Sequence, residues 1–191
     1  MKPLPLILAS SSPRRMMLLQ QIGIVPDHVV SPDIDETPLR NEQPRPYAIR
    51  MAWGKATAVT SPDHLVLAAD TVVAAGRRIL PKAADAAEVR ACLTLLSGRR
   101  HKVMTAIVLT GPDRRATERL VESAVTFNRL TADQIERYVA TREGEGKAGG
   151  YAVNGQAAGF IRFLSGSYSG VVGLPLFETA QLLRGHGWQV P

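Results

Sequence analysis

Short apolar runs alternate along the chain with stretches in which apolar residues recur at helical spacing. The apolar runs predict strands over residues 4–9, 64–75, 101–111, 116–130 and 151–164. Apolar residues three or four positions apart predict helices over residues 13–22, 47–59, 84–98, 132–141 and 176–187. The strands outnumber what a simple alternation of strand and helix requires, so the pattern favours an α/β fold with a mixed sheet over an all-parallel one.

Three stretches between these elements follow neither period. Residues 25–46 are rich in proline and acidic residues, 143–150 in glycine, and 165–175 in glycine and serine, so we expect irregular structure there. Glycine-containing turns are predicted at residues 76–78 and 111–113. No repeat or linker marks a boundary, so we expect a single domain over residues 1–191, with two lobes around a central cleft as the alternative.

The stretch ASSSPRR joins the first predicted strand to the first predicted helix. Ser12 suits the N-cap and Pro13 the first helical position. Arg14 and Arg15 then fall in the first turn, where the partial positive charge of the helix disfavours basic residues. A phosphate group bound at this helix end would give both arginines a partner. The alternative is that both point into solvent, at a cost of about a few tenths of a kcal/mol.

Acidic residues occur at two notable places. Asp70 interrupts the apolar run VLAADTVVAA, and a buried carboxylate is costly unless it is paired. Asp70 therefore lies either at a cleft, where it could accept a proton from water or hold a cation, or in a structural hydrogen-bond network. Asp33, Asp35 and Glu36 cluster in an irregular segment, where they are either solvated or ligands of Mg²⁺ or Mn²⁺.

Three lysines are candidates for phosphate contacts, each with a solvated surface position as the alternative. Lys55 lies on the second predicted helix, Lys82 follows RRIL, and Lys147 stands among the glycines of EGEGKAGG. That glycine-rich segment lacks the Walker A pattern, which argues against a P-loop nucleotidase. The four histidines lack zinc-site spacing, and no G-x-S-x-G motif indicates a serine hydrolase.

Composition narrows the choice of partner without deciding it. Of the 191 residues, 45% are hydrophobic and 21% charged, as in ordinary globular proteins. The net charge of +6 favours a polyanionic partner, either nucleic acid or nucleotide phosphates. Aromatic residues make up only 5%, and the basic residues come in scattered pairs, unlike a surface on which single-stranded bases stack.

The expected location is the cytoplasm. Cys92 is the only cysteine, which excludes an internal disulfide, and its apolar neighbours predict a buried thiol on a helix face. The six-residue apolar run near the N-terminus is far shorter than a membrane span and makes a poor signal peptide.

Taken together, these segments resemble the Maf family of nucleoside triphosphate pyrophosphatases. The motifs that carry the resemblance, in chain order, are LASSSPRRMMLL, DIDET, RMAWGKA, LAADTVV, LLSGRRHKVMTA, KAGGYAVNG and GSYSGVVGLPLFET. The resemblance implies an elongated, strongly twisted mixed sheet flanked by helices around a central cleft, as in inosine triphosphate pyrophosphatases, and a homodimer. It also implies hydrolysis of a nucleoside triphosphate to the monophosphate and pyrophosphate with a divalent cation (Mg²⁺, Mn²⁺ or Co²⁺).

The same resemblance assigns roles to individual residues. Asp70 would be the general base that activates water for attack on the α-phosphorus. Glu36 would help hold the metal together with Asp70. The residues that would line the phosphate path are Ser10, Arg14, Arg15, Lys55 and Lys82.

Base preference within the family depends on three further motif positions. Members that resemble the dTTP and UTP pyrophosphatases carry the equivalents of Arg14 and Thr71, and a glutamine where this chain has Asn154. Asparagine keeps the amide on a side chain one methylene shorter, so we expect the same pyrimidine class with altered affinity or relaxed selectivity. Pro81 and Ala83 also depart from the family pattern around Lys82, and Ser123 stands where threonine is common.

Two other functions remain as alternatives. One is a nucleic-acid-binding or cell-division regulatory protein whose nucleotide site is vestigial, which the basic charge balance motivates. The other is a pyrophosphatase of the same family with a different base preference. The full set of phosphate-site residues favours the enzyme, and the scattered arginine pairs argue against nucleic acid as a partner.

Overall fold

The computed structural model describes residues 3–112 and 115–190. Their elements, in chain order, are β1 (Leu6–Ala9), α1 (Pro13–Gln21), β2 (His28–Val30), α2 (Pro44–Ala58), β3 (Leu65–Ala75), β4 (Arg78–Leu80), α3 (Ala86–Leu96), β5 (Arg100–Thr110), β6 (Ala116–Phe127), α4 (Ala132–Ala140), the 3₁₀ helix η1 (Gln156–Phe160), β7 (Ile161–Ser165), α5 (Tyr168–Val172) and α6 (Leu176–Arg184). Within these ranges no helix is both long and apolar enough to cross a membrane.

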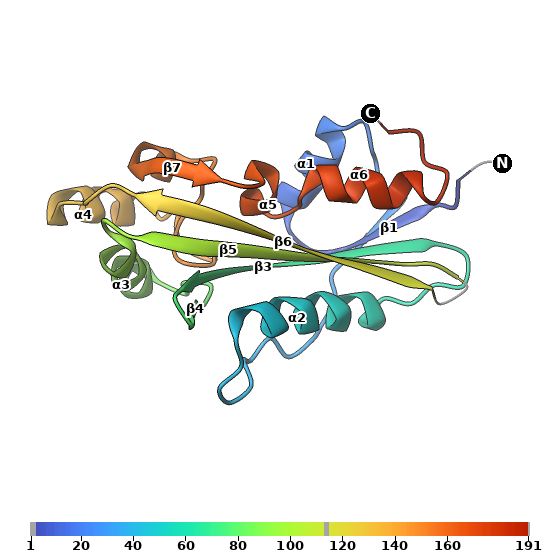
Figure 1. Cartoon of the computed structure of the whole chain (residues 1–191), viewed down its shortest axis with the longest axis horizontal. Helices are drawn as coiled ribbons and strands as arrows, with labels where there is room; N and C mark the ends of the chain where they lie inside the picture. The colour runs from blue at the N-terminus through green and yellow to red at the C-terminus, as the bar shows by residue number, and fades with distance from the viewer. Residues whose placement is uncertain (1–2, 113–114, 191) are drawn as a thin grey trace.

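One mixed sheet of seven strands organises the described residues. Its order is β2-β1-β3-β5-β6-β7, and β4 pairs with β3. β1 runs parallel to β2 and β3, whereas the β3–β5, β5–β6 and β6–β7 pairs are antiparallel. Figure 1 shows β3, β5 and β6 running along the molecule and crossing as the sheet twists, with α2 on one face and α1 and α6 on the other. The expected α/β class with a mixed, elongated and twisted sheet is confirmed.

Alternation along β3 explains how both faces of the sheet are covered. Leu65 and Leu67 pack with leucines of α1 and α6, whereas Val66, Ala68 and Val72 pack with the alanines of α2. Successive side chains of a strand point to opposite faces, so an almost continuous apolar run is what a strand buried on both faces requires. The fully buried small residues on the α2 side let that helix lie close to the sheet.

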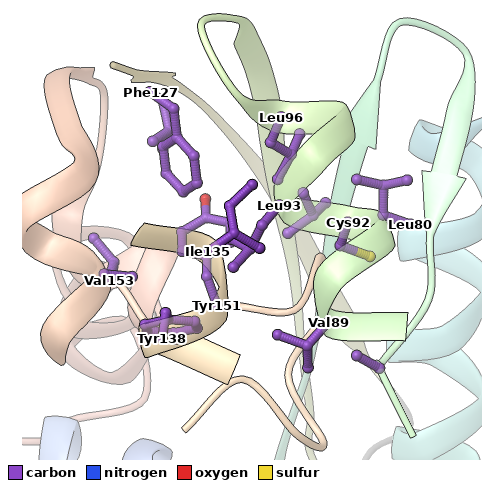
Figure 2. Close-up of a cluster of buried hydrophobic side chains, with 14 of the residues drawn as sticks. Leu80, Val89, Cys92, Leu93, Leu96, Phe127, Ile135, Tyr138, Tyr151 and Val153 are labelled. Atoms are coloured by element: carbon purple, nitrogen blue, oxygen red, sulfur yellow. The ribbon is translucent and has the colours of Figure 1, made fainter. Parts of the chain in front are cut away.

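A third apolar cluster closes the end of the sheet at α3 and α4 (Figure 2). Val89, Cys92, Leu93 and Leu96 form the buried face of α3, as the sequence predicts, so Cys92 is a buried thiol. Burial raises its pKa, which is the opposite of what a reactive thiolate needs. Thr131 caps α4 through a reciprocal capping box with Gln134.

Several expectations about local structure are wrong. Residues 151–164 do not form one strand, because turns and η1 occupy the first ten residues and β7 begins only at Ile161. The segment 165–175 is not wholly irregular, since Ser167 caps the short helix α5. Neither β2 nor β4 was predicted, because three-residue strands carry too little periodicity to detect. Part of the predicted turn at 111–113 lies outside the described residues.

The remaining elements agree with prediction to within a few residues. α2 begins at Pro44 rather than near Tyr47, and α3 ends at Leu96, with Gly98 in the left-handed region at φ 69°. β3 continues through Asp70 without a break in its pairing to β5. The polar residue therefore interrupts the apolar pattern but not the strand.

One edge of β3 is open in its middle. β1 pairs with Leu65–Ala68 and β4 pairs with Val73–Ala75, and β5 occupies the opposite edge along the whole strand. Within the described chain no strand pairs with residues 69–72 on the first edge. The gap lies at the carboxyl end of β1, beside the N-terminus of α1, which is where open α/β sheets commonly bind ligands. Side chains from both faces of β3 reach this gap.

The pocket at this gap confirms the expected central cleft. Asp70 and Thr71 are adjacent on β3 and point to opposite faces of the sheet, yet both line the cleft. Its other walls come from the turn before α1, from α2, and from the glycine-rich segment 143–150 with the residues that follow it.

Burial of His101 near the cleft makes the stability of the folded protein depend on pH. Its Nε2 is 2.8 Å from the hydroxyl of Tyr151, and its ring packs edge-on against Phe127. Burial lowers the pKa of His101 to about 4. The unfolded chain, with a histidine pKa of about 6.5, therefore binds more protons than the folded protein as pH falls through this window.

We expect the free energy of unfolding to fall by about 2 kcal/mol between pH 7 and pH 5 through His101 alone. The measurement is urea unfolding of the wild type and His101→Gln, which does not titrate. A flatter pH dependence is expected for the variant. An equal loss of stability in both proteins would assign the effect to other groups.

Candidate functional site

The N-terminus of α1 lies at the cleft without a side-chain cap. Ser12 occupies the N-cap position, but its side chain makes no capping hydrogen bond, and the first turn contains no acidic residue. The Ser12 amide instead donates to Ser10 Oγ, at 3.2 Å. A helix end without a side-chain cap, flanked by two arginines, is suited to binding an anion.

Arg15 is a buried guanidinium without a carboxylate salt bridge. Its Nε donates to the Gly173 carbonyl and its Nη1 to Ser10 Oγ, both at 2.8 Å. Within the described residues no carboxylate lies within ion-pair distance of it, and its Nη2 donates no hydrogen bond. Burial lowers the pKa of Arg15, and the negative charges of Asp70 and Glu36 oppose that effect. A buried, always charged group with free donors at a cleft requires an anionic ligand.

Asp70 forms a buried ion pair with Lys55. The Lys55 Nζ lies 2.6 Å from Asp70 Oδ1, and both side chains are 7% exposed. Residues 66, 68, 70 and 72 of β3 face α2, and Lys55 lies on the buried face of that helix, which explains why the two meet. The apolar pattern of β3 and the small residues of α2 thus position the charges that they surround.

Glu36 extends this pair into a chain of alternating charges. Its Oε1 lies 2.7 Å from Lys55 Nζ, and its Oε2 lies 2.5 Å from Lys82 Nζ. Tyr47 holds the backbone at the same point, since its hydroxyl donates to the Glu36 carbonyl at 2.7 Å. Partial burial alone would raise the pKa of Glu36, but the hydrogen bonds from Lys55 and Lys82 outweigh it and lower the pKa to about 2. Glu36 is therefore ionised throughout the physiological range.

Glu36 and Asp70 fit a hard divalent cation by ligand type. Both approach the same Lys55 Nζ, so their carboxylates are neighbours, and carboxylate oxygens are the ligands such ions prefer. Across the described ranges no group of three or more histidine, cysteine, aspartate or glutamate side chains could hold a metal. Two carboxylates suffice for Mg²⁺ only when substrate phosphates and water complete the coordination.

Thr71 belongs to a hydrogen-bond network on the other face of β3. Thr105 Oγ1 donates to the Gly170 carbonyl at 2.7 Å and lies 3.0 Å from Thr71 Oγ1. Thr71 also approaches the Gly173 carbonyl at 3.5 Å. These contacts hold the segment that contains α5 against the cleft. Asn154 is exposed and lines the cleft from the segment that follows the glycine-rich loop.

The structure thus brings all nine predicted site residues to one cleft, namely Ser10, Arg14, Arg15, Glu36, Lys55, Asp70, Thr71, Lys82 and Asn154. Asp33 and Asp35 do not line it; Asp35 instead accepts a hydrogen bond from the Thr37 amide. The sequence analysis missed Thr105 and the Gly173 carbonyl, which position Thr71 and Arg15. In the sequence, Thr105 is marked only by being a polar residue within the apolar run KVMTAIVL.

Comparison with known proteins decides the family. The family described as Maf-like protein matches residues 5–186. The chain belongs to the Maf family. A Maf relative from Granulibacter bethesdensis, named dTTP/UTP pyrophosphatase, is 58% identical over 97% of this chain and 94% of its own length. A relative of the same name from Gluconobacter oxydans is 60% identical over 94% of this chain and 86% of its own length.

One solved structure is only distantly similar to this chain. The Staphylococcus aureus Ham1 protein superposes on this chain with a TM-score of 0.40 at 17% identity, covering 64% of this chain and 71% of Ham1. A similarity of that size supports no inference about substrate. Assignment to the Maf family rests on the relatives that match nearly the full length of this chain.

Proposed function

We propose that this Maf protein hydrolyses dTTP and UTP to the monophosphate and pyrophosphate. The observation that carries the proposal is Arg15, a buried guanidinium that pairs with no carboxylate of the described residues and keeps a free donor, beside a helix N-terminus without a side-chain cap. Both features call for an anion, and a triphosphate supplies it. Relatives at 58–60% identity are named dTTP/UTP pyrophosphatase, which supports the choice of a pyrimidine triphosphate.

Asp70 acts as the general base in this mechanism. Its carboxylate accepts a proton from water while the water oxygen forms a bond to the α-phosphorus. The bond from the α-phosphorus to the oxygen that bridges to the β-phosphate breaks, and pyrophosphate leaves with that oxygen. Lys55 orients the Asp70 carboxylate by its hydrogen bond to Oδ1, which leaves Oδ2 to face the water.

The basic residues stabilise the negative charge that develops on the phosphates. Arg14, Arg15, Lys82 and the N-terminal end of the α1 dipole supply fixed positive charge along the phosphate path. Glu36 and Asp70 would hold a divalent cation, Mg²⁺, Mn²⁺ or Co²⁺, which when bound neutralises phosphate charge. Lys55 and Lys82 already contact Glu36, so a divalent cation would compete with these two ammonium groups for the Glu36 carboxylate.

Other properties of the protein remain predictions. They are a single domain over residues 1–191, a homodimer, and a cytoplasmic location, the last inferred from the single cysteine. A nucleic-acid-binding function receives less support than hydrolysis, because Arg15 and Asp70 lie within a cleft rather than on an open basic surface.

The test is pyrophosphate release from a panel of canonical and modified nucleoside triphosphates with Mg²⁺, Mn²⁺ or Co²⁺. We expect dTTP and UTP to give the highest kcat/KM. No turnover of any triphosphate would overturn the proposal, and a preference for a purine would overturn the assignment of the base.

Asn154→Gln tests the specificity residue on the same panel. Glutamine restores the longer amide side chain, so we expect dTTP and UTP to be favoured over other triphosphates by about tenfold more than in the wild type, close to one good hydrogen bond. Asn154 is exposed, so folding should be unaffected. An unchanged preference would remove Asn154 from base recognition.

A further inference from the structure

Lys147 is a cleft residue to which neither the mechanism nor the comparisons assign a role. It lines the cleft with Arg14, and its side chain is partly buried. Its Nζ donates only to a backbone carbonyl, that of Glu145, at 3.3 Å. No carboxylate in the described part of the chain forms an ion pair with Lys147 or with Arg14.

Glu143 is the carboxylate whose charge acts on Lys147, but its hydrogen bond goes to another part of the chain. Glu143 accepts a hydrogen bond from the Gln156 amide at 2.9 Å. Burial lowers the pKa of Lys147, the charge of Arg14 lowers it further, and Glu143 opposes both. Two cations therefore line one cleft with no ion-pair partner among the described residues, which is unfavourable unless an anion binds between them.

The backbone around Lys147 is fixed before any ligand arrives. Ala83 N donates to the Lys147 carbonyl at 3.1 Å, Gly146 N donates to the Ala83 carbonyl at 2.7 Å, and Lys82 and Ala148 form an antiparallel bridge. Gly149 has φ 68°, and a Cβ there would lie 2.7 Å from Val73 Cγ1. The loop thus packs closely against β3 at Val73, and Lys147 is held next to the segment that carries Lys82. Such preorganisation reduces the entropy lost on binding.

We propose that Lys147 is a further phosphate-binding residue, which with Arg14 binds the pyrophosphate part of the substrate. The inference rests on the proposed function for the identity of the ligand. Arg15 and Thr71 both contact the Gly173 carbonyl, and Thr71 adjoins Asp70 on β3, so Arg15 lies on the side of the general base. Lys147 lies instead on the loop that bridges to Lys82, and within the described residues it forms no hydrogen bond or ion pair with Asp70 or Lys55. Arg15 and Ser10 accordingly serve the phosphate that is attacked, and Lys147 serves the leaving group.

The experiment is calorimetric titration of the full chain with inorganic pyrophosphate in Mg²⁺ buffer, for the wild type, Lys147→Gln and Lys147→Arg. Lys102→Gln is the matched control, because Lys102 is an exposed lysine on β5 that pairs with Glu122 outside this cleft. A charge-assisted hydrogen bond contributes about 1.5–3 kcal/mol, so we expect the pyrophosphate Kd to rise at least tenfold in Lys147→Gln. Lys147→Arg should recover most of the affinity, and Lys102→Gln should match the wild type.

Binding of dTMP separates phosphate recognition from a structural effect. Its Kd should change by less than about twofold in Lys147→Gln, because dTMP lacks the leaving group. An unchanged pyrophosphate Kd, an equal loss of dTMP binding, or no recovery in Lys147→Arg would each overturn the inference. A wild type that binds pyrophosphate but hydrolyses no triphosphate would overturn the proposed function instead and leave the role of Lys147 in place.

Discussion

Asp70→Asn is expected to lower kcat for dTTP by about 10³-fold while the protein stays folded, since a positioned general base typically contributes 10²–10⁴. Asparagine retains the shape and the oxygen that accepts from Lys55, but it cannot take a proton from water. Lys55 also keeps Glu36 as an ionic partner, so the buried ammonium is not left unpaired. The measurement is steady-state pyrophosphate release together with a thermal melt of each protein.

Asp63→Asn is the matched control for this variant. The same chemical change is made here at an exposed residue just before β3 that does not line the cleft. The kcat of Asp63→Asn should therefore equal that of the wild type. A kcat of Asp70→Asn within about threefold of the wild type would remove Asp70 from catalysis. Its carboxylate would then be a structural partner of Lys55 only.

Lys55→Met is expected to destabilise the protein by about 3–5 kcal/mol as well as to abolish turnover. The substitution leaves the Asp70 carboxylate, 7% exposed, without the ammonium that lies 2.6 Å away. Breaking a buried ion pair from one side costs this much because the remaining charge keeps its desolvation penalty. The loss is a large share of a total stability that is about 5–15 kcal/mol in most domains. Urea unfolding measures it directly.

A double variant separates the contribution of this ion pair to protein stability from its role in catalysis. Lys55→Met combined with Asp70→Asn removes both charges, so we expect the double variant to be more stable than Lys55→Met and still inactive. Lys102→Met should cost less than about 1 kcal/mol, because its ion pair with Glu122 lies at the surface, where solvent screens it. A double variant no more stable than Lys55→Met would show that the ion pair with Asp70 does not govern stability at this site.

The parts of the fold that could be predicted are those with long, regular patterns. The apolar run of β3, the leucine spacing of α6 and the Thr131 cap of α4 each follow from local chemistry. The segment 151–164 was misread because Tyr151 and Val153 are buried by tertiary packing against α3 and α4, and their alternation imitates a strand. Local pattern does not distinguish these two causes of burial.

The candidate site was predictable as a set of residues but not as an arrangement. Asp70 was identifiable because a carboxylate in an apolar strand needs a partner, yet nothing in the sequence says that Lys55, fifteen positions earlier, is that partner. The open edge of β3 depends on where β1 stops and β4 begins, and β4 is too short to detect. The different environments of Arg14 and Arg15, one half-buried and one fully buried, likewise depend on packing around Gly173.

The central claim is that water activated by Asp70 attacks the α-phosphorus of a pyrimidine triphosphate. Hydrolysis of dTTP in ¹⁸O-labelled water, followed by mass spectrometry of both products, tests it most directly. The predicted result is one ¹⁸O atom in dTMP and none in pyrophosphate, with labelled dTMP formed about 10³-fold more slowly by Asp70→Asn. Label in pyrophosphate, or release of orthophosphate as the first product, would contradict the claim.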